Sequence, residues 1–335
     1  MPLNIVMLIG SLGLILLCCS TFVNAVERFA KDLGLHQGIT GSILAAVSTA
    51  LPETLIPIIA ILFTQGVGGH DIGIGAIAGA PFMLGTLAFF VTGMAVIIFA
   101  GLKKRSVAMN TDISCLSRDL VFFLLFYGTA VATTLVHDYT IVKAVIAIAL
   151  LASYGIYLKQ TYHSKVAEID SVDELYVARF FKLPANMTWV IVQLVLSLLF
   201  MLAGAHFFIK GVQAISEVMK INPLILSLLI TPFATELPEK FNSVIWISRK
   251  QDTLALGNVT GAMVFQSCFP VVFGMLFTPW HLEGVTLISA ALALLSATIV
   301  LIWVRVRKSI NPYILLLGGV FYSIFVTYVA VKAFG

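Results

Sequence analysis

The stretch Ser48-Thr49-Ala50-Leu51-Pro52-Glu53 lies inside a long apolar segment, and Ala234-Thr235-Glu236-Leu237-Pro238-Glu239 lies inside another. Both contain Thr-x-Leu-Pro-Glu. A charged side chain at the centre of a membrane helix costs roughly 2.5–3.5 kcal/mol. A proline lacks a backbone donor, so carbonyl oxygens near it stay free. Carboxylate, hydroxyl and carbonyl oxygens are ligands of hard cations. The duplicated stretch therefore predicts a cation site between two halves of a membrane protein.

The composition excludes an ordinary soluble domain. Of the 335 residues, 60% are hydrophobic and 11% are charged, whereas soluble domains have about 25% charged residues. A membrane-spanning helix needs about 20 mostly apolar residues. On that basis we expect an all-α membrane protein with ten transmembrane segments, roughly 2–25, 39–64, 72–101, 119–136, 141–158, 187–210, 222–247, 253–278, 284–304 and 311–332.

The polar stretch 159–186 divides these segments into five and five. We expect a first five-helix repeat in 1–158, a linker in 159–186 and a second five-helix repeat in 187–335. Because five is an odd number, the second repeat enters the membrane from the opposite side, and the two halves are inverted repeats. Transporters of that architecture bind their substrate near the middle of the membrane.

Basic residues indicate the orientation. Fifteen of the 20 Lys and Arg residues fall in the loops after the odd-numbered segments. The positive-inside rule then predicts a multi-pass protein of the cell membrane with both termini outside and a cytosolic central loop. The expected partners are membrane lipid and inorganic cations. The net charge of +4 follows from this asymmetry and does not indicate nucleic acid. The sequence indicates no oligomeric state.

The candidate ligands share helix faces. Thr49 and Glu53 are four residues apart, as are Thr235 and Glu239, and residues at that spacing lie on one face. The pseudo-two-fold axis would bring the two glutamates near each other. Two carboxylates in a low dielectric repel, so they need a cation or protons between them.

Two further charges accompany the second stretch. Glu236 and Lys240 are also four residues apart and can pair along one helix. Two interpretations stay open: an internal salt bridge that neutralises both residues, or Lys240 acting as a tethered cation in place of a transported ion. Gln266 is a further candidate ligand because its amide oxygen can accept.

Small residues recur after each proline-glutamate stretch, at Gly75-x-x-x-Gly79 and Gly257-x-x-x-Gly261. This spacing predicts close helix packing. The acidic residues that precede these two segments, Asp71 and Asp252, are predicted N-caps.

These motifs resemble those of the cation/calcium exchanger superfamily, whose two repeats carry Gly-Thr-Ser-Leu-Pro-Glu and Gly-Asn-x-x-Gly-Ser-Asn-x-x-Asn. The resemblance is specific over 42–84 and 228–268. It implies Glu53, Glu239, Thr49 and Thr235 as metal ligands. Several family oxygen ligands are replaced by apolar residues, at Ala50, Ala80, Leu84 and Ala262. These losses favour coupling to fewer sodium ions or to protons, with Glu236 as a proton carrier.

We therefore expect a secondary antiporter that exchanges a divalent cation, calcium, for Na⁺ or H⁺ by alternating access. The chain has no nucleotide-binding loop, metalloprotease helix or nucleophile elbow, so an enzyme is not expected, and neither is any cofactor beyond the transported ions. Two alternatives stay open: a channel or uniporter for monovalent cations, and a non-transporting binding or regulatory protein of the same fold.

Overall fold

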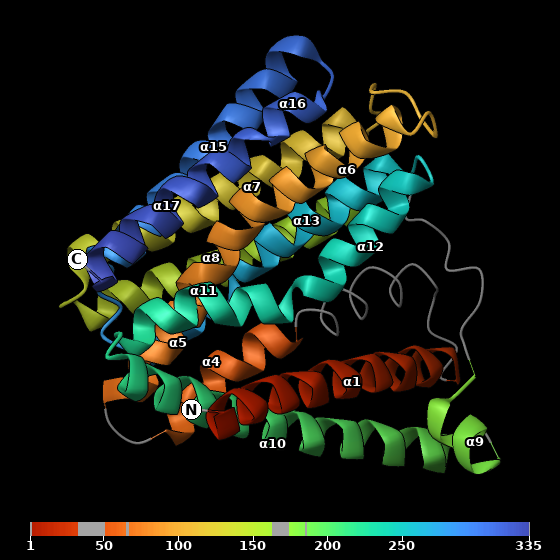
Figure 1. The fold of residues 1–335 in the computed structure, drawn as a ribbon, viewed down its shortest axis with the longest axis vertical. Helices are drawn as coiled ribbons and strands as arrows, with labels where there is room; N and C mark the ends of the chain where they lie inside the picture. Colours follow the sequence, from red (N-terminus) through yellow and green to blue (C-terminus); the bar gives the residue numbers. More distant parts are fainter. Residues whose placement is uncertain (1, 33–50, 65–66, 163–173, 185, 335) are drawn as a thin grey trace.

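The computed structural model describes residues 2–32, 51–64, 67–162, 174–184 and 186–334, and all regular structure within them is helical. The helices, drawn in Figure 1, are α1 (Pro2–Asp32), α4 (Leu51–Phe63), α5 (Val67–Met83), a π-helical turn (Leu84–Ala88), α6 (Phe89–Gly101), α7 (Ile113–Ala132), a 3-10 turn η3 (Thr133–Val136), α8 (Thr140–Tyr162), α9 (Tyr176–Phe181), α10 (Met187–Met219), α11 (Pro223–Thr235), α12 (Leu237–Ser248), α13 (Asp252–Gln266), α14 (Phe269–Phe277), α15 (Val285–Arg307), α16 (Pro312–Leu315) and α17 (Leu317–Phe334).

Eight stretches of the described chain are long and apolar enough to cross a membrane. This confirms an all-α, multi-pass membrane protein. Two predicted segments appear instead as the shorter apolar helices Glu53–Phe63 and Pro223–Phe233. The first of them lies in α4, which begins at Leu51 directly after undescribed residues. The second continues into α12 through a break.

Two of the eight spans form the centre of the molecule. Gly68–Gly101 and Asp252–Phe277 have 61% and 72% of their apolar windows buried, whereas the other spans have between 17% and 50%. These two spans correspond to the third and eighth predicted segments, which occupy equivalent places in the two halves. The largest hydrophobic cluster surrounds them with residues of α7, α8, α15 and α17.

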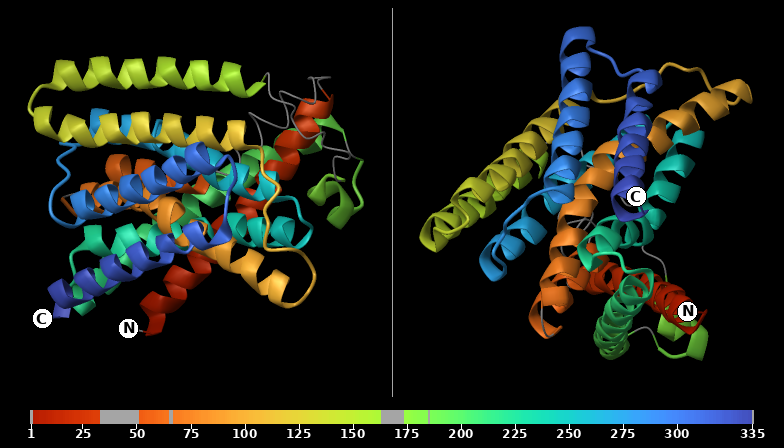
Figure 2. Two further views of the ribbon diagram at one scale, coloured as in Figure 1. Left: turned by 90° about the horizontal axis from the view of Figure 1, so that it is seen from above. Right: turned by 60° about the vertical axis from the view of Figure 1, so that its left-hand side comes forward.

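The helices α1 and α10 form an antiparallel pair along one side of this bundle (Figures 1 and 2). A second hydrophobic cluster, which includes Ile15, Ile56 and Phe208, joins the pair to α4. The helix α10 is longer than the expected segment 187–210: it continues to Met219 and ends where Lys220 adopts a left-handed conformation, with φ of 55°.

The second proline-glutamate stretch is a break between two helices. The helix α11 ends at Thr235, Glu236 has φ of −88° and ψ of −1°, and α12 begins at Leu237. Pro238 occupies the first turn of α12 and has no N–H to donate backwards, which explains why the helix does not continue unbroken. A second break follows Gln266, between α13 and α14, with Pro270 in the first turn of α14.

The first glycine motif packs two helices together at backbone distance. A Cβ added at Gly75 would overlap the carbonyl oxygen of Leu224, and one added at Gly79 would overlap that of Leu228. The predicted close packing of α5 is therefore confirmed, with α11 as its partner. At Gly257 no described atom lies within 4 Å of an added Cβ, so the packing role of the second motif stays a prediction.

The N-cap predictions for Asp71 and Asp252 are wrong. Asp71 lies inside α5, which begins at Val67. Asp252 is the first residue of α13, after a Gln251 N-cap. Its buried carboxylate accepts from Arg105 at 2.6 and 2.8 Å, and this ion pair fastens the loop after α6 to the start of α13.

Candidate functional site

The break between α11 and α12 holds a buried ion pair. Lys240 Nζ donates to Glu236 Oε2 at 2.8 Å, and the two residues are 9% and 1% exposed. Buried charges are tolerated only when they are paired. Of the two interpretations offered by the sequence, the structure shows the internal salt bridge. Glu236 Oε1 is buried and has no hydrogen-bond partner among the residues that the structure describes.

Gln266 joins this pair from the end of α13. Its side chain lies beside the Glu236 carboxylate and is 2% exposed. Within the described chain, its Oε1 has no hydrogen-bond partner. Two acceptor oxygens, Oε1 of Glu236 and Oε1 of Gln266, are thus buried near a helix break without a hydrogen-bond donor among the described residues. Buried polar atoms nearly always have a partner, so these oxygens suit a cation or an added proton.

A row of hydroxyl groups leads along α11 to this break. Thr235 Oγ1 donates to the Thr231 carbonyl at 3.0 Å, Thr231 and Ser227 share a hydrogen bond of 3.1 Å, and Ser227 Oγ donates to the Ile72 carbonyl at 2.7 Å. Sequence reasoning named only Thr235. The four-residue spacing of Ser227 and Thr231 before it was the available signal. Because Thr235 uses its proton on Thr231, its lone pairs stay available to a cation.

The structure describes the remaining predicted ligands only in part. Glu53 is 5% exposed in the first turn of α4, and α4 contacts both α11 and α14. The backbone of Glu239 lies in the first turn of α12, one residue before Lys240; its side chain and the whole of Thr49 lie outside what the structure describes.

The equivalent motif positions of the first half carry side chains without oxygen. Ala76 and Ala80 of α5 and Leu84 of the π-helical turn occupy these positions and are 3%, 4% and 1% exposed. On α13, in contrast, Asn258 keeps an amide whose buried Nδ2 has no hydrogen-bond partner in the parts of the chain that the structure describes. The described polar groups therefore come mainly from the second half of the chain.

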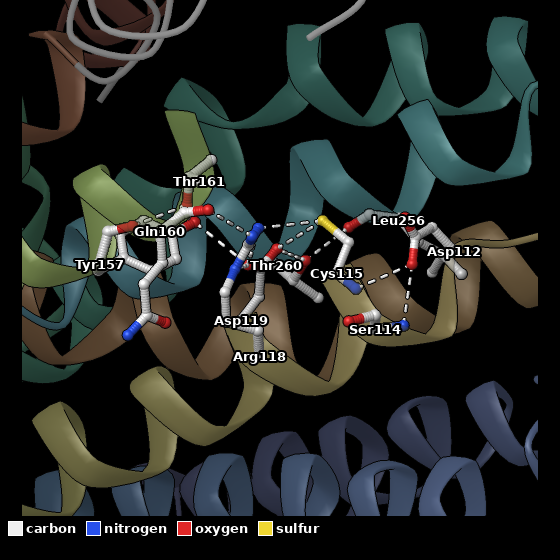
Figure 3. Close-up of polar contacts among 10 residues, drawn as sticks. All are labelled: Asp112, Ser114, Cys115, Arg118, Asp119, Tyr157, Gln160, Thr161, Leu256 and Thr260. Carbon is white, nitrogen blue, oxygen red and sulfur yellow. Dashed lines mark hydrogen bonds and ion pairs between the residues drawn. The ribbon is translucent and has the colours of Figure 1, made fainter. Parts of the chain in front are cut away.

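Sequence reasoning missed a second polar network, which joins α7, α8 and α13 (Figure 3). The buried Asp119 carboxylate accepts from Arg118 Nη2 at 3.1 Å and from Tyr157 Oη at 3.3 Å. Thr260 Oγ1 lies 2.8 Å from Asp119 Oδ2 and 3.1 Å from the Leu256 carbonyl, and its single proton serves one acceptor at a time. The network holds α13, which carries Gln266, against the scaffold helices.

The fold is that of known membrane cation exchangers. The structure superposes on a crystal structure of the H⁺/Ca²⁺ exchanger CAX with a TM-score of 0.72 and 16% sequence identity, over 97% of this chain and 81% of that one. Its TM-score against the sodium-calcium exchanger NCX_Mj is 0.56, with 21% identity over 97% of this chain and 98% of the other.

The sequence also places the chain in a family. The family model described as sodium/calcium exchanger protein matches residues 3–160 and again residues 189–334. The chain therefore belongs to the sodium/calcium exchanger family. It is 26% identical over 299 residues to CaxA of Alkalimonas amylolytica, a protein named as a candidate antiporter, and the alignment covers 88% of each chain.

Proposed function

We propose that this protein is a secondary antiporter that exchanges a divalent cation, calcium, for Na⁺ or H⁺ by alternating access. The observation that carries this proposal is the pair of buried acceptor oxygens, Glu236 Oε1 and Gln266 Oε1, that have no donor within the described part of the chain beside the helix break. Family membership and the exchangers of similar fold support it. Glu53, Glu239, Thr49 and Thr235 would provide the remaining ligands.

The charges favour a small number of counter-ions. Glu53, Glu236, Glu239 and Lys240 sum to −2. Lys240 already compensates Glu236, so two carboxylates remain, and one divalent cation or two monovalent ions would neutralise them. The apolar side chains of Ala76, Ala80 and Leu84 lack the oxygens that sodium would need as ligands. This favours an exchange of fewer sodium ions, or of protons, for each calcium ion.

The proposal includes the finer architecture. The two shorter helices, α4 and α11, would be parts of interrupted spans, which raises the eight detected spans to ten. The two family matches support five-helix repeats in 1–158 and 187–335, joined by the linker 159–186. The basic loops support a cytosolic linker and termini that both lie outside.

One observation favours a second candidate function. The buried Ala76, Ala80 and Leu84 leave one half of the site without side-chain ligands. A protein that retains the fold and binds a cation without transporting it would have the same appearance.

Flux measurements separate these functions. The purified protein is reconstituted into vesicles, and labelled calcium is followed under a sodium gradient, under a pH gradient and under neither. Antiport predicts flux that requires one of the two gradients. Calcium binding without flux under any condition would favour the non-transporting candidate, and equal flux under all three conditions would contradict antiport. A Hill slope near three for sodium, unaffected by pH, would contradict the coupling proposal.

A further inference from the structure

The short helix α9, which ends the central linker, is capped by side chains from two membrane helices. Asn24 Oδ1 of α1 accepts from the backbone N–H of Tyr176 at 3.0 Å, and Gln193 Oε1 of α10 accepts from that of Val177 at 2.8 Å. Asn24 Nδ2 also donates to the Glu174 carbonyl at 3.2 Å. First-turn N–H groups have no partner within their own helix, so these bonds fix α9 at one end of the α1–α10 pair (Figure 1).

The two sides of this segment differ. Leu175 and Ala178 are 0% and 6% exposed and pack against α1 and α10. Phe180 and Phe181 are 81% and 64% exposed, with ring centroids 5.0 Å apart. Two neighbouring Phe rings facing water would be an exposed apolar patch of the kind that marks an interaction surface.

The height of α9 along the pair indicates what covers these rings. Beyond Asn24, α1 carries charges, including the Arg28–Asp32 ion pair of 3.0 Å. On the other side of this level, beyond Gln193, α10 exposes Val195 and Leu199, apolar residues that face lipid in a membrane span. The helix α9 is therefore level with the boundary between the apolar surface and the charged end of the pair.

We propose that α9 lies in the membrane–water interface, with Phe180 and Phe181 inserted into the lipid and Arg179 and Lys182 bound to anionic phospholipid headgroups. Both basic side chains are exposed on the segment that carries the two Phe rings. Apolar insertion combined with basic residues is the usual physical basis of interfacial binding. Because Asn24 and Gln193 cap α9, headgroup binding there acts directly on α1 and α10.

Spin labelling tests the insertion, and its result does not depend on transport activity. Phe180→Cys is labelled with a nitroxide in a variant whose four native cysteines are replaced, in vesicles of phosphatidylcholine and phosphatidylglycerol. We expect oxygen to relax the label more than a water-soluble nickel chelate does, as at Ile302→Cys on the exposed face of α15. Accessibility like that of Ser309→Cys, in the exposed turn after α15, would overturn the proposal.

Charge substitutions test the headgroups. The apparent affinity for phosphatidylglycerol is read from the depth of the Phe180→Cys label as the anionic lipid fraction rises. In Arg179→Gln/Lys182→Gln this affinity should fall on the order of tenfold. The matched control Lys103→Gln/Lys104→Gln removes two exposed charges from the loop after α6 and should leave it unchanged. Equal effects of the two variants, or no effect of either, would contradict headgroup binding at α9.

Discussion

The Glu236–Lys240 pair sets the charge of the proposed site at the scale of single residues. Its two members lie four residues apart on either side of the start of α12, and both are buried. Breaking a buried pair by removing one member leaves the other charge without compensation, which is more costly than removing both. This asymmetry makes the pair testable.

We expect Lys240→Met to lower the free energy of unfolding by about 3 kcal/mol, and Glu236→Gln/Lys240→Met to recover most of that loss. Thermal unfolding of the purified protein measures both variants. Lys210→Met, at an exposed position of α10, is the control and should be nearly neutral. A double variant less stable than Lys240→Met alone would show that the pair does not act as one unit.

Glu53→Gln is expected to abolish calcium binding, because it removes a charged ligand from a site sheltered from water. Binding of labelled calcium to the purified protein provides the measurement. Glu217→Gln, which changes an exposed glutamate near the end of α10, should bind as the unchanged protein does. Wild-type affinity in Glu53→Gln would remove Glu53 from the site.

The polar contacts that the sequence predicts and those that it does not differ in one respect. This is the number of residues that separate the two partners along the chain. Glu236 and Lys240 share a helix, so their spacing alone predicts the contact. Beyond its neighbour Arg118, Asp119 takes partners from α8 and α13, 38 and 141 residues away. No local periodicity records such a contact, and the Asp119 network appears only once the helices are packed.

At the scale of elements, α5 and α11 approach each other at backbone distance, where a side chain at Gly79 would collide with a carbonyl oxygen. Backbone cannot move aside as the end of a side chain can, so the two helices must separate if Gly79 is enlarged. Such overpacking typically costs 1–3 kcal/mol.

Gly79→Ala should therefore lower stability by about 2 kcal/mol, measured as a fall in the unfolding temperature. Gly128→Ala in α7 is the matched control, because an added Cβ there meets nothing within 4 Å. It should be neutral or slightly stabilising, since alanine favours helix more than glycine does. Equal effects of the two substitutions would contradict the tight contact.

Element boundaries were less predictable than element identity. Runs of apolar residues locate the membrane-spanning helices, but the helices continue into flanking segments that contain polar residues. Asp112 caps α7 by accepting from Ser114 and Cys115, so the helix begins at Ile113, six residues before the expected start at 119. Similarly, α10 continues past Lys210 through a mixed sequence. Hydropathy alone does not predict these longer helix ends, because the hydrogen bonds that cap a helix decide where it begins or ends.

At the scale of the whole molecule, the basic residues predict which side each loop faces. Ser106, in the exposed loop after α6, should face the cytosol, and Asp138, with a side chain 82% exposed between η3 and α8, should face outside. With the native cysteines replaced, an impermeant maleimide applied to intact cells should label Asp138→Cys and not Ser106→Cys. The reverse pattern would invert the orientation.

The contact between α5 and α11 also joins the two halves of the chain. The helix α5 belongs to the first family match and α11 to the second, so glycine-to-carbonyl packing joins the two halves near the centre of the molecule. They resemble the subunits of an obligate dimer that happen to share one polypeptide. Two fragments expressed separately and divided at the linker should associate in the same membrane, whereas either fragment alone would present the α5 or α11 surface uncovered.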